Sequence, residues 1–278
     1  MKREASPGAQ AERQRLPESS PALDVERERL PDPEPGLRLE RVTYTSEGLR
    51  VKGYLVTGAG GEPRPPLVYC RGGIRGVGMV RVARLVTLAR RGYTVFAPFY
   101  RGNEGGEGRE DFGGEDRHDL FHALRVVRGL PEAAPLAPAL IGFSRGALMA
   151  LAAARECEGV GPVVVWGGVS DLRLTYDERV DLRRMLKRVV GHPRKDSSAY
   201  ERRSPVCWAA DIRTPVLIVH GSVDEHVSVT HAYRLAEALQ AAGRPFTLSV
   251  YEGRGHVFPR EEDERVLDYL LAWIESAR

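Results

Sequence analysis

The chain has 278 residues, of which 42% are hydrophobic and 28% charged, so it is long enough to bury one large core or two small ones. Its 41 Lys and Arg residues nearly balance 38 Asp and Glu residues, which leaves a formal net charge of +3 at pH 7. No basic stripe with interleaved aromatic residues is present, and we expect no nucleic-acid partner. No apolar run reaches the roughly 18 residues of a membrane span, so we expect no membrane partner.

The N-terminal stretch, residues 1–36, is rich in Pro, Arg, Glu and Ser and poor in large apolar residues. Such a composition buries too little surface to offset the entropy of ordering, and it predicts a flexible arm. From Leu37 apolar and polar residues alternate on both sides of Glu47-Gly48, which predicts a β-hairpin. We therefore predict an arm over 1–36 and one domain over 37–278.

Strand and helix patterns alternate along the rest of the chain. In chain order we predict strands at 66–70, 93–100, 137–143, 161–168, 215–221 and 246–253, and helices at 79–92, 118–130, 145–156, 178–190, 230–243 and 261–276. Strands separated by helices need crossover connections, which favour a mostly parallel sheet with helices on both faces. Residues 171–206, between two strands, are predicted to form a small helical cap over the sheet edge.

The segment "GFSRGALMAL" places Ser144 between Gly142 and Gly146, at the junction of a predicted strand and a predicted helix. This is the sequence motif of a nucleophile elbow, a strained turn that leaves no room for side chains beside the serine. The helix that follows would direct its N-terminus at any negative charge that develops there. A serine in an ordinary turn can have the same motif. Whether an acid and a base accompany the serine therefore decides between the two interpretations.

An acid and a base follow Ser144 in the order that this elbow requires. Asp224 lies just after the strand "PVLIVHG", with Glu225 as the adjacent competitor, and His256 follows the next strand in "GRGHVF". We predict that His256 accepts the serine proton and that Asp224 orients its imidazole ring.

Tetrahedral intermediates of acyl transfer need backbone N–H donors aimed at the developing oxyanion. We predict one donor at the amide of Arg145, directly after the serine. The second is expected in the loop "RGGIRG" after an earlier strand, at the amide of Gly73 or Ile74.

Five stretches resemble the catalytic domain of the prolyl oligopeptidase family of serine peptidases, which has the α/β-hydrolase fold. They are "GYTVFAPFYRGNEGGEG", "FGGEDRHDL", "GFSRGALMAL", "ERRSPVCWAADIRTPVLIVHGSVDEHVSV" and "YEGRGHVF", and the resemblance runs from about residue 66 to the end. It implies a triad of Ser144, Asp224 and His256, as the residue pattern does. It also implies a peptidase. We expect no cofactor.

The chain departs from that family in three respects. One is that it shows no counterpart of the glutamates with which dipeptidyl peptidases hold a free amine. Only about 65 residues precede the strand at 66–70, too few for the β-propeller that the large peptidases carry, so we expect none. Arg71 stands where some members place a tyrosine as a side-chain oxyanion donor. We therefore predict a serine hydrolase that cleaves peptide, acyl-peptide or ester bonds of small substrates. The alternatives are a small-ester carboxylesterase and a non-catalytic ligand-binding relative.

Other candidate sites have simpler interpretations. His118 and His122 lie four apart on one helix, but no third ligand has a matching position, so we expect no metal site. The glycine-rich loops match no nucleotide-binding motif. His220 is interpreted as structural, and Asp116 and Asp119 as helix-capping residues.

The three cysteines, Cys70, Cys157 and Cys207, form neither a disulfide framework nor a zinc-site spacing. We interpret them as buried small apolar residues in a reducing compartment. Because the N-terminus also lacks the apolar stretch of a secretory signal, we expect a cytoplasmic protein.

Overall fold

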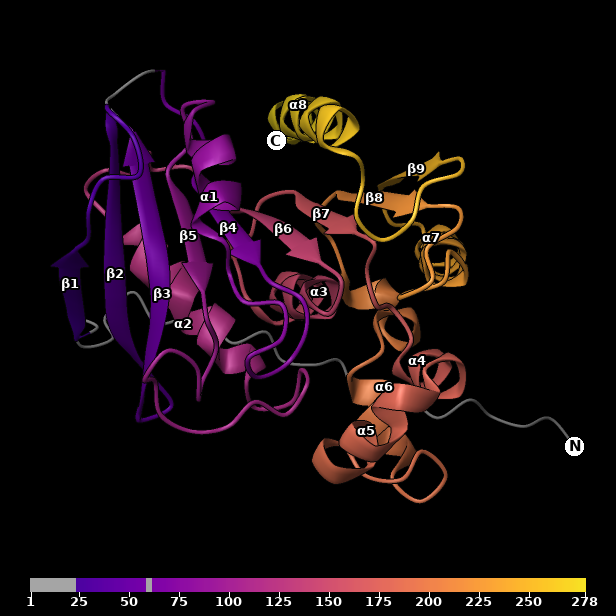
Figure 1. Ribbon diagram of the computed structural model, residues 1–278. Coiled ribbons are helices and arrows are strands. Elements are labelled where there is room, and N and C mark those ends of the chain that lie inside the picture. Colours follow the sequence, from indigo (N-terminus) through magenta and orange to yellow (C-terminus); the bar gives the residue numbers. More distant parts are fainter. Residues whose placement is uncertain (1–23, 59–61) are drawn as a thin grey trace, which may run out of the picture.

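A single nine-stranded sheet organises the protein in a computed structural model that describes residues 24–58 and 62–278 (Figure 1). The strand order is β1-β2-β3-β5-β4-β6-β7-β8-β9. The strands are β1 (Val25–Arg29), β2 (Leu37–Ser46), β3 (Leu49–Gly58), β4 (Leu67–Cys70), β5 (Val95–Pro98), β6 (Ala139–Phe143), β7 (Val163–Trp166), β8 (Val216–Gly221) and β9 (Phe246–Tyr251). From β5 to β9 all neighbours are parallel, whereas β1, β2 and β3 form an antiparallel edge. The predicted fold class is confirmed.

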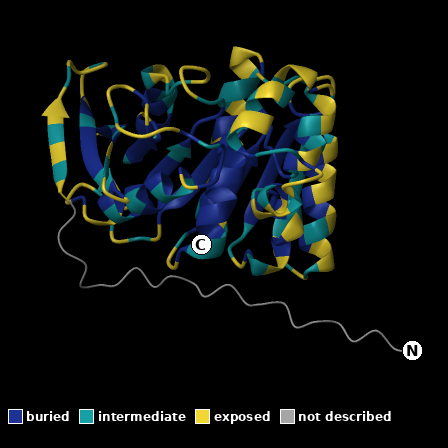
Figure 2. Cartoon of the chain, turned by 90° about the horizontal axis from the view of Figure 1, so that it is seen from below, coloured by how far each residue is buried: buried dark blue, intermediate teal, exposed yellow. Residues whose placement is uncertain are grey.

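Helices cover both faces of the sheet. Consecutive side chains of its central strands point to opposite sides and are apolar, so both faces need a covering layer. One apolar core joins the sheet to α1 and α8, and the other joins it to α2, α3 and α7. These helices are α1 (Val82–Ala89), α2 (Arg117–Arg128), α3 (Gly146–Glu156), α7 (Thr230–Ala241) and α8 (Arg260–Ser276). Figure 2 shows the result as a buried central sheet between helices whose outward faces are exposed.

The predicted arm over residues 1–36 is wrong in its last third. Val25–Arg29 form the edge strand β1, paired antiparallel with β2, while residues 1–23 lie outside the described residues. β1 is mostly exposed, and Arg27 bonds to Glu40 and Glu132. Backbone pairing and charge hold this strand, so its sequence has no run of large apolar residues that would have revealed it.

Between β7 and β8 the chain forms short helices that gather in one group outside the sheet layers (Figure 1). They are α4 (Leu172–Glu178), η1 (Val180–Leu182), α5 (Arg183–Val189), α6 (Ser197–Arg202), η2 (Pro205–Cys207) and η3 (Ala209–Asp211). The sequence pattern predicted only the stretch around α5, because α5 continues directly from η1, whereas α4 with 7 residues and α6 with 6 residues stand alone.

His231 of α7 anchors the start of this inserted segment. Its Nδ1 accepts hydrogen bonds from the backbone N–H groups of Ser170 at 3.2 Å and Asp171 at 3.3 Å. The ring is buried, and burial lowers the pKa of His231 to about 4. The folded protein therefore holds this histidine neutral, since a protonated Nδ1 accepts no hydrogen bond.

We predict that His231 makes the protein lose stability as the pH falls from 6.5 to 4. Over this range the unfolded chain binds a proton at His231 and the folded protein does not, at a cost of about 3 kcal/mol. Urea unfolding at several pH values should therefore show the stability advantage of the wild type over His231→Gln shrinking by about that amount between pH 7 and pH 4. A pH-independent difference between the two proteins would contradict the assignment.

Candidate active site

Ser144 lies on a strained turn between β6 and α3. Its backbone φ is +55°, in the left-handed region that non-glycine residues rarely adopt. The turn closes against other backbone, because a Cβ on Gly146 would lie 1.9 Å from the Cys70 carbonyl oxygen and one on Gly142 would lie 2.6 Å from the Gly146 carbonyl oxygen. Both flanking glycines of the predicted elbow are therefore sterically required.

Asp224 and His256 meet at the same carboxyl edge of the sheet. Asp224 follows β8 and His256 follows β9, and His256 Nδ1 lies 2.7 Å from Asp224 Oδ2. The other carboxylate oxygen accepts the backbone N–H groups of His226 at 2.8 Å and Val227 at 2.9 Å. Glu225 is exposed, so of the two adjacent acids the structure pairs Asp224 with the histidine.

The charge of Asp224 is stabilised although the carboxylate is buried. Burial raises its pKa, but hydrogen bonds from His220 and His256 outweigh burial and hold the pKa of Asp224 well below its usual range. His220 is itself fully buried, with Nε2 at 2.8 Å from the Val227 carbonyl oxygen and 3.4 Å from Asp224 Oδ2. His220, interpreted from sequence only as a structural residue, thus also contacts the acid of the site.

The chain neighbours of Ser144 and of its backbone partner Trp166 lie close to this histidine–acid pair. The Phe143 ring, directly before Ser144, lies 4.8 Å from the His256 ring. The Ser144 N–H donates to the Trp166 carbonyl at 3.0 Å. A Cβ on Gly167, the residue after Trp166, would lie 3.1 Å from His256 Nδ1. Within the described residues the Ser144 hydroxyl makes no hydrogen bond, and catalytic hydrogen bonds often form only when substrate is bound.

The loop after β4 faces the serine. A Cβ on Gly72 would lie 2.8 Å from Ser144 Cβ and 3.3 Å from its Oγ, so only backbone fits at this approach. Gly73 has a φ of +63°. Across residues 24–58 and 62–278, the N–H groups of Gly73, Ile74 and Arg145 donate to no protein acceptor. None of the three predicted oxyanion donors is therefore taken up by another group in that part of the chain.

Behind the serine lies a buried charge cluster that the sequence pattern did not reveal. Arg71 and Arg145 both bond to Glu110, and Arg145 also bonds to Asp116 at 3.1 Å. These four side chains are at most 4% exposed. Nothing in the sequence distinguishes Glu110 from the other acids of its glycine-rich loop.

The interpretation of Asp116 and Asp119 as capping residues is wrong. Asp116 occupies the N-cap position of α2, but its side chain makes no capping hydrogen bond. It accepts instead from the Gly113 N–H at 2.7 Å and from Arg145, and burial raises its pKa to about 7. Asp119 forms a buried ion pair with Arg101 at 2.8 Å. Both carboxylates therefore bind arginines that are distant in sequence, Arg145 and Arg101.

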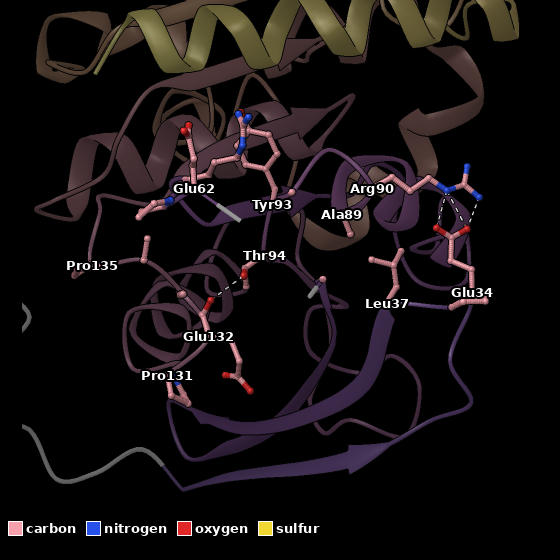
Figure 3. A pocket seen from close by; sticks show the side chains of 18 residues that line it. Glu34, Leu37, Glu62, Ala89, Arg90, Tyr93, Thr94, Pro131, Glu132 and Pro135 are labelled. Carbon is pink, nitrogen blue, oxygen red and sulfur yellow. Dashed lines mark hydrogen bonds and ion pairs between the residues drawn. The ribbon is translucent and has the colours of Figure 1, made fainter. Parts of the chain in front are cut away.

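A hollow at the opposite edge of the sheet has no part in this site. It has a volume of about 550 Å³ and lies at the amino ends of the parallel strands, next to Tyr93, Thr94 and Glu132 (Figure 3). Arg90 and Glu34 on its wall are paired with each other, and none of the residues that line it belongs to the serine, histidine or oxyanion segments.

The metal-site and membrane expectations can be compared with the described residues. No group of three or more His, Cys, Asp or Glu side chains in residues 24–58 and 62–278 is arranged to hold a metal ion. His118 and His122 both face Glu47, at 3.5 and 2.9 Å. In the same part of the chain, no helix combines the length and the apolar character that a membrane crossing needs.

Comparison with known proteins identifies the family. A model of the prolyl oligopeptidase family matches residues 79–277. The uncharacterized peptidase YtmA of Bacillus subtilis is 45% identical over 237 residues, which cover 84% of this chain and 92% of the relative. The chain belongs to the prolyl oligopeptidase family. It is accordingly a serine hydrolase, as the resemblance implied.

Solved structures agree with this family assignment. A puromycin-hydrolyzing peptidase of Mycobacterium tuberculosis is 26% identical, with a TM-score of 0.74 over 91% of this chain and 39% of its own length. Acetyl xylan esterase 1 from Thermoanaerobacterium is 16% identical, with a TM-score of 0.71 over 90% of this chain and 88% of its own, and shares the fold. This member of the prolyl oligopeptidase family therefore shares its fold with both peptidases and esterases.

We predict that Gly146→Ala destabilises the protein strongly. The added methyl group meets the Cys70 carbonyl, a backbone atom that cannot move aside as a flexible side chain can, and overpacking of this kind costs about 3 kcal/mol. Gly129→Ala is the matched control, because Gly129 has a helical φ of −88° and its nearest neighbour would lie 3.5 Å away. Thermal unfolding of both variants measures the difference, and equal melting temperatures would contradict the prediction.

Proposed function

We propose that this protein hydrolyses peptide, acyl-peptide or ester bonds of small substrates through a covalent acyl-enzyme on Ser144. The observation that carries the proposal is the 2.7 Å Asp224–His256 hydrogen bond at the same sheet edge as the strained Ser144 turn. No metal or other cofactor takes part in the proposed reaction.

In the first step Ser144 Oγ attacks the substrate carbonyl carbon while His256 Nε2 takes the hydroxyl proton. Nε2 is the ring nitrogen in that role, because Nδ1 is held by Asp224. The ionised Asp224 stabilises the imidazolium that forms. The Arg145 amide and that of Gly73 or Ile74 bind the oxyanion. His256 then gives its proton to the leaving amine or alcohol, and the C–N or C–O bond breaks.

Water completes the cycle by the same route. His256 removes a proton from a water molecule, the resulting hydroxide attacks the acyl carbon, and the proton returns to Ser144 as the acid product leaves. α3 begins at Gly146, two residues after Ser144, and the dipole of its N-terminus favours the negative charge in both proposed tetrahedral intermediates.

The substrate is proposed to carry an apolar group. Three strongly exposed valines lie on the predicted site loops: Val77 in the loop after β4, Val223 before Asp224 and Val257 after His256. A fourth exposed valine, Val180 of η1, lies on the inserted segment. Next to Val180, Arg179 donates to the His226 carbonyl at 2.8 Å, which ties the inserted segment to the loop that carries Asp224. We therefore propose that residues 171–206 act as a cap that contributes to substrate selection.

The cytoplasm remains the proposed compartment. All three cysteines are unpaired, as is usual where thiols are kept reduced. Cys70 and Cys157 are buried as expected, whereas Cys207 is exposed, contrary to the interpretation from sequence.

We predict that Ser144→Ala and His256→Ala lose p-nitrophenyl ester hydrolysis by a factor of about 10⁴ or more while remaining folded. Ser144→Ala should also lose labelling by a fluorophosphonate probe, which bonds to an activated serine. Ser249→Ala is the control, because this serine lies on β9 and its hydroxyl bonds to Tyr269. Undiminished turnover in Ser144→Ala would refute the nucleophile assignment, and a wild type that is never labelled would favour the non-catalytic alternative.

We further predict that the wild type cleaves an acyl-amino-acid anilide with an apolar side chain as well as short-chain esters. Val180→Ser should lower kcat/KM for the apolar substrate about fourfold, the value of roughly one buried methylene group, and leave acetate ester hydrolysis unchanged. Tyr269→Ser, an exposed apolar position on α8, is the control. Hydrolysis of short esters alone would instead identify a small-ester carboxylesterase.

A further inference from the structure

Glu110 joins three backbone segments at one buried carboxylate. It lies in the loop between β5 and α2 and is 4% exposed. Its Oε1 accepts from Arg71 Nη2 at 2.8 Å and from Arg145 Nη2, and its Oε2 accepts from the backbone N–H of Arg75. Arg145 is itself a proposed oxyanion donor, Arg71 directly precedes the Gly72-Gly73 pair, and Arg75 directly follows Ile74.

On the loop side, Arg71 sets the direction of the proposed Gly73 donor. Arg71 Nη1 donates to the Gly72 carbonyl at 2.9 Å and to the Val77 carbonyl at 3.2 Å. The Gly72 carbonyl and the Gly73 N–H belong to one planar trans peptide and point in opposite directions. Holding the carbonyl on the guanidinium therefore orients the N–H, and the Gly72 backbone of this same loop faces Ser144.

On the nucleophile side, Arg145 donates its own backbone N–H to the proposed oxyanion hole, while its side chain reaches back into the protein. The guanidinium bonds to Glu110 and to Asp116, and it is 1% exposed. The side chain of the residue after the nucleophile is thus held by the same carboxylate that holds Arg71.

The charges make Glu110 necessary to this arrangement. The Arg71 and Arg145 guanidinium groups lie over the same Tyr100 ring, at 5.3 and 5.0 Å from its centre. Two buried cations this close repel each other, and a buried charge without a partner is strongly destabilising. Glu110 lies between them and also bonds to the Arg75 N–H, so its charge draws the two segments together.

We propose that Glu110 is a positioning residue of the oxyanion hole, acting through Arg71 and Arg145 to hold the Gly73 and Arg145 amides in register with Ser144. This inference rests on the proposed hydrolase function and adds to it a residue that no substrate atom touches. Because the donors matter most when the carbonyl oxygen becomes an oxyanion, Glu110 acts on the transition state more than on substrate binding.

The test is Glu110→Gln, which keeps the shape of the side chain and removes its charge. We expect kcat for a p-nitrophenyl ester to fall about 10- to 100-fold, with KM within about twofold of the wild type, since displaced donors cost less than deleted ones. A trifluoromethyl ketone, which adds Ser144 to form a hemiketal oxyanion, should bind more weakly by a similar factor.

Asp119→Asn is the matched control, because the Asp119–Arg101 pair is equally buried and contacts neither the Gly72–Arg75 loop nor the Ser144 turn. It should lose stability and, at a temperature where circular dichroism shows it folded, keep kcat and inhibitor affinity within about threefold. Arg71→Lys serves as a second variant if Glu110→Gln does not fold, and should show the same selective loss of kcat and inhibitor affinity.

Two outcomes would overturn the positioning role. One is folded Glu110→Gln, or Arg71→Lys in its place, with wild-type kcat and wild-type inhibitor affinity. The other is an Asp119→Asn variant that loses both quantities as much as Glu110→Gln does. Either result leaves wild-type turnover that depends on Ser144 intact, and with it the proposed function. A wild type with neither turnover nor fluorophosphonate labelling would overturn the function itself and this inference with it.

Discussion

The close approach of α3 to the carboxyl ends of β4 and β6 is the constraint on which the site depends. The first residue of α3, Gly146, lies so near the Cys70 carbonyl that no side chain fits between them. This contact forces the chain into a tight turn at Ser144, with φ at +55°. The same contact brings the loop after β4 against the serine side chain. One backbone approach thus presents the serine and places the oxyanion loop beside it.

Around this turn the charged side chains form two separate buried clusters. On the open side, Asp224 is ionised and held by His256, His220 and two backbone N–H groups. On the closed side, Glu110 lies between Arg71 and Arg145. In the proposed reaction, the first cluster supports the proton transfer through His256. The second holds the backbone amides that would stabilise the negative charge. Apart from His220 on β8, these residues lie in loops that follow the carboxyl ends of parallel strands, where such sheets commonly bind ligands.

Much of the fold was predictable from local pattern. The hairpin around Glu47-Gly48 and the alternation of buried strands with amphipathic helices agree with β2 to β9 and with the five helices that cover the sheet. The order serine, acid, histidine also led to Asp224 and His256, which the structure joins by a hydrogen bond. These signals survive in sequence because periodicity and glycine-flanked turns reflect local geometry.

Other features had no local signal. β1 is held by pairing with β2 and by Arg27 rather than by an apolar face. The short helices α4 and α6 stand alone, whereas η1 and α5 form one continuous helical stretch. Asp116 was interpreted as a cap because its nearest neighbours in sequence belong to a helix, yet its partner Arg145 is 29 residues away.

The sequence by itself determined the fold class, the family and the identity of the serine, acid and histidine candidates. Only the tertiary structure decided which of two adjacent acids is paired with His256 and that Glu110 links Arg71 to Arg145. Side-chain charge pairing depends on distances between segments remote in sequence, and those distances exist only after the sheet has assembled.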